Sequence, residues 1–396
     1  MTEMVYGTVK HSSAEPSLSK WLHSIDRWSI LCVLTLFGIG LLLGLSSSPP
    51  LAEKNEYSPF YYVYKQVVFG SLALSCMFIF STLSKTSIRR FAVLFFLVTF
   101  IALALLPVFG TDFGKGATRW YSFGLGSFQP SEFLKPVFVV LSAWLIAESQ
   151  KINGPPGNFI SFFIAMLIKG RMLITILLVI QPDFGQAMLI LFGWSVVYFV
   201  GGASIVLLLI IAFATICLGF VMYSISEHFR RRIDGFLSVD IDPTTQIGFV
   251  SNAIREGGWF GVGVGKGEVK WSLPDAHTDF IIAVAAEEYG LTLVTVIISL
   301  YITVTIRSLH RLMNKKDPFA RLAGVGLTAM FAMQALINMG VAVRLLPAKG
   351  MTLPFISNGG SSLIATGIAL GMLLVFTKLE PQGDVRDLLV KRRKGR

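Results

Sequence analysis

The stretch LPDAHTDFIIAVAAEEYG, residues 273–290, decides the fold class and locates the candidate site. Its first half is polar and acidic, and its second half enters an apolar helix that carries Glu287 and Glu288. Apolar sequence continues to about Ile306, which is enough to cross a bilayer because about 20 helical residues do so. A continuous helix would place the two glutamates about 12–14 Å deeper than Asp279. Charges at such a depth are costly unless they are paired or face water, so we expect a polar cavity here.

The composition indicates an all-α, polytopic membrane protein. Hydrophobic residues make up 54% of the 396 residues and charged residues only 14%, with long apolar runs throughout. The net charge of +11 does not indicate nucleic-acid binding, because basic residues also mark the cytoplasmic face of membrane proteins. The three cysteines lie inside apolar runs, which excludes a secreted disulfide framework, and no Cys/His spacing predicts zinc.

Ten apolar runs are predicted to form transmembrane helices. The run at 172–181 is short for a span, but only an even total places every basic loop and the N-terminus on the cytoplasmic side. We therefore expect ten helices with both termini cytoplasmic. The runs lie at about 28–46, 64–83, 90–108, 132–148, 172–181, 184–201, 203–223, 279–306, 322–343 and 357–377.

This topology divides the chain into three regions. A cytoplasmic tail at 1–27 precedes a ten-helix membrane domain at 28–378, and a basic cytoplasmic tail follows at 379–396. The largest outer loop, 224–278, joins the seventh and eighth helices. Loops of this length are usually functional or disordered, so we expect it to contribute to the site.

Several basic residues fall on the expected outer side. They are Lys115, Arg119, Arg230, Arg231, Arg232, Arg344 and Lys349. Arginine suits a phosphate because its planar fork donates two hydrogen bonds at once. Long outer loops also carry basic residues that bind no ligand. These residues are therefore either contacts to an anionic ligand or solvated loop charges, and the sequence leaves both interpretations open.

Asp279 is the candidate general base. It begins the eighth predicted helix from the outer side, where partial burial raises the pKa of a carboxyl group towards neutrality. An aspartate in the first turn of a helix also serves simply as a cap or a partner of the helix dipole. The residue alone does not decide between these roles.

Lys135 is the predicted partner of the two deep glutamates. It lies a few residues into the fourth span, which Glu132 begins. We expect Lys135 to pair with Glu287 or Glu288 across a polar cavity between the fourth and eighth spans. A purely structural buried pair is the alternative to a substrate contact.

Other polar positions receive weaker predictions. QPDFGQ at 181–186 breaks two apolar runs, and we favour an outer turn over a cavity wall with Asp183 pointing inward. Asp240 and Asp242 leave a divalent cation, Mg²⁺ or Mn²⁺, open as the only candidate cofactor. The glycine-rich segment at 257–267 lacks the strand–turn–helix context of a nucleotide loop. Gln334 and Asn338 are spaced for hydrogen bonds between helices or for lining the cavity.

Five blocks of this sequence together resemble the SEDS family, the shape, elongation, division and sporulation proteins. The blocks are KGATRWYSFGLGSFQPSEFLK, QPDFGQA, GGWFGVGVGKG, LPDAHTDFIIAVAAEEYG and LLPAKGMTLPFISNGGSS. The resemblance covers about residues 28–378, and its AHTDF and LPAKGMTLPF forms are more similar to the division branch than to the elongation branch.

The resemblance implies ten spans and a peptidoglycan glycosyltransferase of the bacterial inner membrane that polymerises lipid II. It implies that Asp279 is the essential acid and that Arg119 and Lys135 are functional residues. It also implies a class B penicillin-binding protein and other division proteins as partners. Three positions depart from the family pattern, namely Gln186, Asn358 and the block at 236–249, in which Gln246 still fits.

These inferences combine into one mechanistic hypothesis. Asp279 takes a proton from a sugar hydroxyl that attacks an anomeric carbon, with inversion, and cations stabilise the departing lipid diphosphate. The candidate substrate contacts are Arg119, Glu132, Lys135, Arg231, Gln246, His277, Glu287, Glu288, Lys349 and Ser357. A flippase that moves the same lipid across the membrane is the alternative, because intramembrane charges and broken helices also suit a transporter.

Overall fold

The computed structural model describes residues 21, 23–111, 119–122, 126–151, 154, 183–202, 204–225, 227–238, 245–273, 275–347 and 350–379, apart from the side chains of Phe184, His228 and Arg232. The described elements are α2 (Arg27–Lys54), α3 (Tyr61–Thr82), α4 (Lys85–Phe109), β1 (Tyr121–Ser122), β2 (Ser127–Phe128), α5 (Pro130–Ser149), α8 (Phe184–Val200), α9 (Ile205–Ile225), α10 (Glu227–Leu237), α11 (Gln246–Gly257), α12 (Val269–Ser272), α13 (Ile281–Met313), α14 (Pro318–Ala342) and α15 (Gly360–Phe376).

The membrane helices begin at residues that favour helix starts. The side chains of Asp26, Ser84 and Asp317 accept backbone N–H hydrogen bonds in the first turns of α2, α4 and α14. Pro130 and Pro318 occupy the first positions of α5 and α14, where the missing N–H has no cost.

Seven of the described helices are long and apolar enough to cross a membrane, namely α2, α3, α4, α5, α9, α13 and α14. Residues 185–200 and 360–376 form two shorter apolar helices. Nine of the predicted spans therefore coincide with apolar helices. The predicted span at 172–181 lies outside the described residues, so the total of ten stays a prediction.

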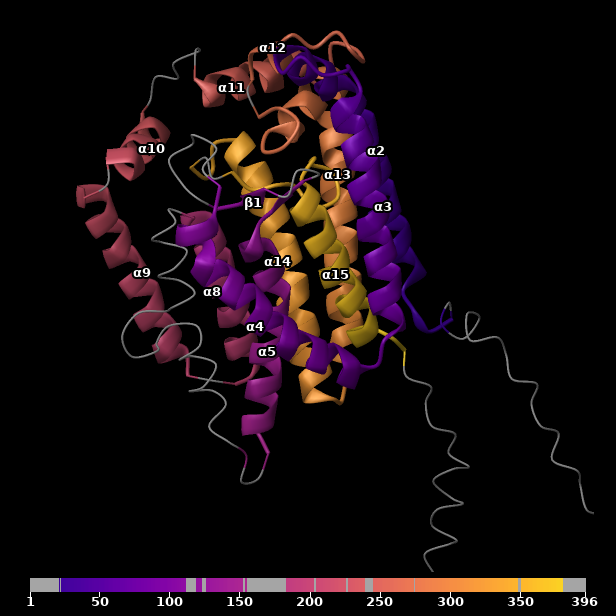
Figure 1. Cartoon of the computed structure of the whole chain (residues 1–396), viewed down its shortest axis with the longest axis vertical. Helices are drawn as coiled ribbons and strands as arrows, with labels where there is room; N and C mark the ends of the chain where they lie inside the picture. Colours follow the sequence, from indigo (N-terminus) through magenta and orange to yellow (C-terminus); the bar gives the residue numbers. More distant parts are fainter. Residues whose placement is uncertain are drawn as a thin grey trace, which may run out of the picture.

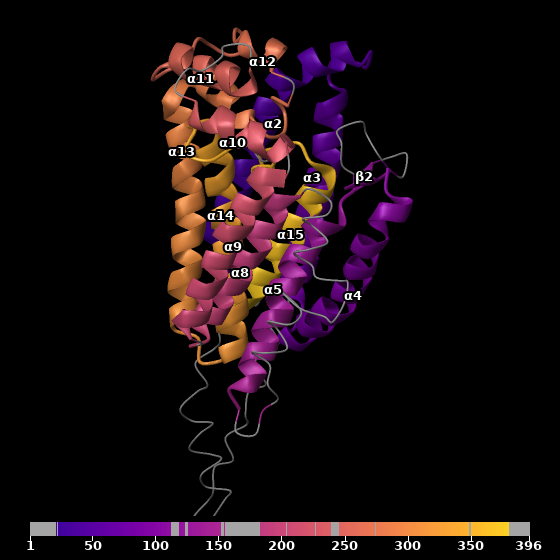
Figure 2. The same ribbon diagram turned by 90° about the vertical axis from the view of Figure 1, so that its left-hand side faces the viewer.

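The helices form a bundle with α5 in its interior and α9 at its edge. α5 packs against α4, α8, α14 and α15, and α15 packs against α3 (Figures 1 and 2). α9 contacts α8 and α10 among the described elements and lies at the left side of Figure 1. Its almost wholly exposed apolar surface is that of a helix surrounded by lipid.

The start of α2 and the end of α15 lie at the same end of the bundle. The backbone N–H of Leu379 donates to the carbonyl of Ser24 at 2.9 Å. Beside this contact, Arg307 near the end of α13 pairs with Asp26 at 2.7 Å. A chain that crosses a membrane an even number of times has both ends of its membrane domain on the same side, as the ends of α2 and α15 are here.

The eighth predicted span is not one straight helix, because the chain doubles back at Gly290. Gly290 has a left-handed φ of 75° inside α13. The carbonyl of Asp279 binds Asn338, and the ring of Tyr301 lies tilted against that of Phe331, seven residues before Asn338 on α14. These two contacts lie about 10 Å apart along α14. A continuous helix from Asp279 to Tyr301 would have 22 residues and span about 33 Å, so the chain cannot be one straight helix between them.

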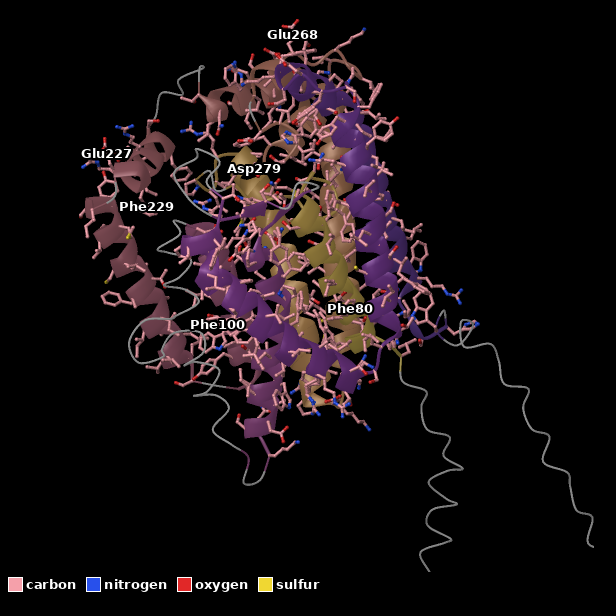
Figure 3. All side chains as sticks on the ribbon, in the orientation of Figure 1. Phe80, Phe100, Glu227, Phe229, Glu268 and Asp279 are labelled. Carbon is pink, nitrogen blue, oxygen red and sulfur yellow. The ribbon has the colours of Figure 1, made fainter. Side chains whose placement is uncertain are left out.

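The prediction that Glu287 and Glu288 lie deeper than Asp279 is therefore wrong. The short helix at 281–289 runs outward from Asp279, and the long part of α13 returns across the membrane. Glu287 contacts the backbone of Glu268, which lies at the top end of the molecule, whereas Asp279 lies further inside (Figure 3). Helical periodicity continues through residue 290, so the apolar pattern did not reveal the reversal.

Candidate active site

Asp279 lies half-buried where α14 and the segment after it meet the short helix at 281–289. The Nδ2 group of Asn338 donates to the backbone carbonyl of Asp279 at 2.9 Å and to that of Met351 at 2.5 Å. A Cβ atom at Gly350 would lie 3.3 Å from Oδ2 of Asp279, so the carboxylate faces this glycine closely. Gly350 has φ 32°, which glycine adopts without strain.

The residues before Asp279 are held by the segment at 351–358. The hydroxyl of Ser357 donates to the carbonyl of Thr278 at 2.5 Å, and the N–H of Asn358 donates to the carbonyl of His277 at 3.0 Å. The imidazole of His277 lies against the ring of Tyr62, with centroids 5.3 Å apart. The structure thus places His277 and Ser357 near Asp279. Ser357 holds the backbone of Thr278, and the ring of His277 lies against Tyr62.

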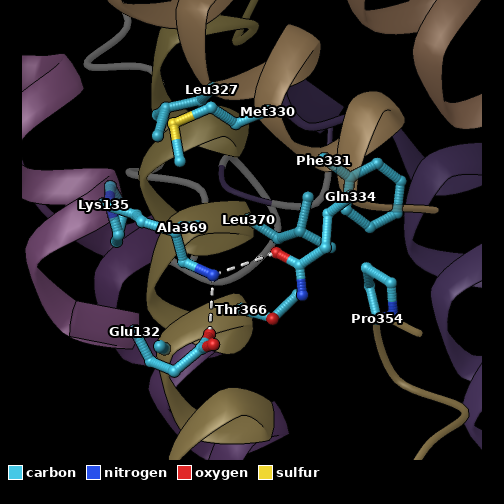
Figure 4. Close-up of a pocket in the computed structure, with 12 residues that line it drawn as sticks. Glu132, Lys135, Leu327, Met330, Phe331, Gln334, Pro354, Thr366, Ala369 and Leu370 are labelled. Atoms are coloured by element: carbon cyan, nitrogen blue, oxygen red, sulfur yellow. Dashed lines mark hydrogen bonds and ion pairs between the residues drawn. The ribbon is translucent and has the colours of Figure 1, made fainter. Parts of the chain in front are cut away.

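Lys135 belongs to a buried polar chain that reaches this segment. Its Nζ atom lies 2.8 Å from Oε2 of Glu132 and 3.3 Å from Oε1 of Gln334 (Figure 4). Gln186 donates to the other carboxylate oxygen of Glu132 at 2.6 Å. Gln334 in turn donates to the carbonyl of Thr352 at 3.0 Å, next to the Met351 carbonyl that Asn338 binds.

The predicted pairing of Lys135 with Glu287 or Glu288 is wrong. The partner of Lys135 is Glu132, one helical turn earlier on α5. The reversal at Gly290 carries the two glutamates to the outer end of the bundle, where Glu288 pairs with Lys270 at 2.6 Å. The buried carboxylates of Glu132 and Glu288 are thus each paired with a lysine, whereas Glu287 accepts backbone N–H groups.

A small cavity of about 30 Å³ lies beside Lys135 and Glu132. Lys135, Glu132, Gln334 and Thr366 supply its polar wall, and side chains of α14 and α15 supply an apolar one (Figure 4). A cavity of this size with a polar wall has room for one or two water molecules and not for a sugar or a diphosphate.

The side chain of Asp183, which precedes α8, points inward, as in the alternative that the sequence left less favoured. Asp183 is 8% exposed, and its carboxylate accepts a hydrogen bond from Gln129 at 3.2 Å; residues 181 and 182 of the predicted outer turn lie outside the described residues. Burial raises the pKa of Asp183, and the neighbouring charge of Glu132 adds to this, while the positive charges of Arg119 and Lys135 lower it; the balance is a raised pKa. These charges place Arg119 and Lys135 within electrostatic reach of one buried carboxyl group.

Three predicted site residues lie apart from this polar chain. Arg231 lies on α10 at the edge of the bundle, pairs with Glu227 at 2.5 Å and is exposed (Figure 3). Gln246 begins α11 and is exposed. Arg344 donates to the carbonyls of Phe236 and Ser238 at 3.2 and 3.0 Å, which fixes the end of α10. The predicted residues Lys115, Lys349, Asp240 and Asp242 lie outside the described residues.

Within the part of the chain that the structure describes, no group of three or more His, Cys, Asp or Glu residues is arranged to hold a metal ion. The acid pair at 240 and 242 is not among these residues. A divalent cation therefore stays a prediction.

Sequence reasoning missed Lys270 and Tyr301. Lys270 is 6% exposed, and Tyr301 donates from its buried hydroxyl to the carbonyl of Pro354 at 2.5 Å. Two deep glutamates required a cation, and this was the signal for Lys270. No pattern in the sequence pointed to Tyr301, because an aromatic residue in an apolar span is usually packing.

An apolar groove of about 650 Å³ runs between α13 and α14. It extends along α13 from Leu291 to Ile306 and along α14 beside Leu336, with Ile282 at the Asp279 end. The 15 residues from Leu291 to Ile306 span about 22 Å of helix, so the groove follows much of the bilayer.

Comparison with known proteins places these features in context. The family described as cell cycle protein, the group of FtsW, RodA and SpoVE, matches residues 27–380. The chain is 38% identical over 366 residues to the probable peptidoglycan glycosyltransferase FtsW of Caulobacter vibrioides, covering 92% of each chain. It is 33% identical to the protein of the same description from Trichlorobacter lovleyi, covering 89% of this chain and 93% of that one.

Two solved structures have a similar fold. One is described as "Structural coordination of polymerization and crosslinking by a peptidoglycan synthase complex", with a TM-score of 0.72 and 27% identity over 89% of this chain and 97% of that chain. The other is the rod shape determining protein RodA of Thermus thermophilus, with a TM-score of 0.65 and 27% identity over 89% of this chain and 96% of that chain.

Proposed function

The chain belongs to the cell cycle protein family of FtsW, RodA and SpoVE and is a peptidoglycan glycosyltransferase of cell division, and we propose that it polymerises lipid II with Asp279 as general base. The carboxylate takes the proton of a sugar hydroxyl as that oxygen attacks the anomeric carbon of a second lipid II molecule. The bond from this carbon to the diphosphate breaks, and the lipid diphosphate leaves. A direct displacement of this kind inverts the anomeric carbon.

One observation supports this assignment above the others. Gln334 and Asn338, one turn apart on α14, bind the adjacent carbonyls of Thr352 and Met351. Gln334 also binds Lys135, and Asn338 also binds the carbonyl of Asp279. A base and a buried cation are thus fixed relative to each other by one helix face, as the transfer of a proton beside a departing anion requires.

Arg119 and Lys135 are the proposed stabilisers of the leaving diphosphate. Both act electrostatically on buried Asp183, which supports their lying at one site. An arginine fork fits a diphosphate better than the exposed and paired Arg231 does. Arg119 is accordingly the proposed direct contact, and Lys135 supplies a second positive charge near Asp183. The remaining candidates, Lys349 and Gln246, are proposed as loop contacts to the substrate.

The proposed orientation places Asp279 on the outer side of the bacterial inner membrane at the septum. The chain then crosses the membrane ten times, with cytoplasmic termini and with the loop at 224–278 outside. The common end of α2 and α15 supports an even number of crossings. The basic side chains at that end, Arg307 and Arg311, fit the cytoplasmic face.

The apolar groove between α13 and α14 is the proposed contact for a partner, a class B penicillin-binding protein. Its length supports a single apolar helix packed lengthwise against both. Its lining is apolar, so a helix in the bilayer would gain packing contacts there.

Purified protein with labelled lipid II in detergent tests the proposal against the flippase alternative. Detergent has no two sides, so only an enzyme yields a glycan polymer. Polymer formation that is lost in Arg119→Ala supports the proposed role of Arg119. Lipid movement between leaflets of vesicles without any polymer in detergent contradicts the proposed mechanism.

A further inference from the structure

A second buried ion pair lies at the outer end of the bundle, away from the Lys135 chain. Nζ of Lys270 donates to Oε1 of Glu288 at 2.6 Å, to the hydroxyl of Ser46 at 2.9 Å and to the carbonyl of Gly265 at 3.1 Å. The same Glu288 oxygen accepts a hydrogen bond from Ser46. The side chains of Lys270 and Glu288 are 5% and 0% exposed. The pair therefore joins three segments: α2, the outer loop and α13.

The neighbouring Glu287 ties the same helix to the same loop. Its Oε1 atom accepts the backbone N–H groups of Glu268 and Val269 at 2.7 and 2.9 Å, where α12 begins. The backbone carbonyls of Glu287 and Glu288 accept the N–H groups of Val262 and Gly263 at 2.8 and 3.2 Å. The outer end of the helix at 281–289 is thus held on several sides.

Asp279 lies at the other end of this helix. Nine residues separate it from Glu288, and a helix is stiff along its axis, so a shift at one end displaces the other. Asn338 and Ser357 hold the inner end only through the backbone carbonyls at 278 and 279. The backbone contacts at the inner end and the anchor at the outer end therefore together set the position of the helix along its own axis.

We propose that Lys270 and Glu288 form a positioning pair that fixes the helix at 281–289 and so sets where the Asp279 carboxylate meets the substrate. This inference rests on the proposed role of Asp279 as the base. The pair does not touch the substrate, and its effect on the reaction passes through the helix.

A double-mutant cycle separates positioning from plain stability. Lys270→Met and Glu288→Gln each leave a buried group without its partner, so each single variant should unfold at a lower temperature. The double variant K270M/E288Q removes both charges and keeps both shapes, so its Tm should return to near that of the wild type. A pair that only stabilises the fold would then also recover its kcat.

For a positioning pair, the double variant should keep a kcat about 10- to 100-fold below the wild type, with KM for lipid II within about twofold, because misplacing a catalytic group costs rates of this size. The control is K85M/D317N, which removes the partly exposed pair between Lys85 and Asp317 at 3.0 Å, where α4 and α14 begin, and should leave kcat unchanged. Wild-type kcat in a folded K270M/E288Q would overturn the proposal.

Two further variants keep the proposal testable if the double variant does not fold. Lys270→Arg retains the charge, and it should keep more of the wild-type kcat than a folded Lys270→Gln does; equal kcat values for these two contradict positioning. Asp279→Asn is assayed in parallel. Full activity of Asp279→Asn would contradict the proposed role of Asp279 as the base. An inactive Asp279→Asn together with a fully active K270M/E288Q would contradict only the positioning role of Lys270 and Glu288.

Discussion

Asn338 binds Asp279 through the backbone and not through the carboxylate: its Nδ2 group lies 2.9 Å from the carbonyl oxygen of Asp279. This contact therefore holds the backbone of Asp279 and uses neither oxygen of its carboxylate. The same amide also binds the carbonyl of Met351, so Asn338 joins the acid to the segment that follows α14.

Asn338→Leu keeps the size of the side chain and removes both donors. We expect kcat to fall about 10- to 100-fold because the acid loses one of its fixed contacts, with KM little changed. Steady-state polymerisation of lipid II measures this. Leu97→Ala, on the exposed surface of α4, is the control and should retain full activity. Equal polymerisation rates for the two variants would show that Asn338 does not position Asp279.

Gly290→Ala should prevent the chain reversal within α13. A Cβ atom there would lie 2.3 Å from the carbonyl oxygen of Trp259, and the φ of 75° is strained for alanine. The conformation alone costs roughly 1–3 kcal/mol, so we expect a clear drop in Tm and in folded yield in detergent. Gly219→Ala is the matched control, because no atom lies within 4 Å of its added Cβ. Unchanged folding of Gly290→Ala would contradict the reversal.

The ion pair at the common end of α2 and α15 should make stability depend on acidity. Burial raises the pKa of Asp26, but hydrogen bonds from Arg307 and Ser29 and the charge of Arg311 outweigh it and hold this pKa below its usual 3.8. A depressed folded pKa contributes stability that is present above the unfolded value and is lost as the pH falls through the folded one.

Asp26→Asn should therefore unfold at a lower temperature than the wild type at pH 7. The difference in Tm should stay constant down to about pH 5 and shrink as the pH falls below about 3.9. Thermal unfolding in a detergent that is insensitive to pH measures both. A difference that grows in acid would have the wrong sign for this ion pair.

Bulk added to the groove between α13 and α14 should weaken binding of the penicillin-binding partner. Ile302→Trp and Leu336→Trp place an indole where the partner helix would pack, so co-purification should drop while polymerisation by the isolated enzyme persists. Leu97→Trp on α4, also exposed to lipid, is the control and should bind normally. If polymerisation is lost instead, the groove holds the lipid tail of the substrate.

The apolar runs were sufficient to predict the helices but not their internal breaks. A bilayer requires about 20 apolar residues in each crossing, so this constraint is written into the sequence. The reversal at Gly290 depends on one left-handed glycine, and the apolar residues on both sides of it read as a single helix.

The partner in each ion pair was harder to predict than the position of a helix along the sequence. Lys135 was expected to reach across the bundle, yet its partner Glu132 is one turn away on the same helix. Lys270 falls in the predicted outer loop, where a lysine is normally solvated, and only the folded chain brings it, on α12, to Glu288. Asp279 was a candidate because it begins a predicted membrane helix, and the family resemblance implied its role as the essential acid. The backbone contacts of Asn338 to Asp279 and of Ser357 to Thr278 depend on tertiary packing, which the sequence does not show.

The central claim is that the Asp279 carboxylate removes the proton from the attacking hydroxyl. Asp279→Asn is nearly isosteric, so the variant should fold, bind lipid II and melt close to the wild-type temperature. Its polymerisation rate in detergent should fall by at least about 100-fold, within the contribution typical of general base catalysis. A folded Asp279→Asn protein that makes glycan polymer at the wild-type rate would contradict the claim.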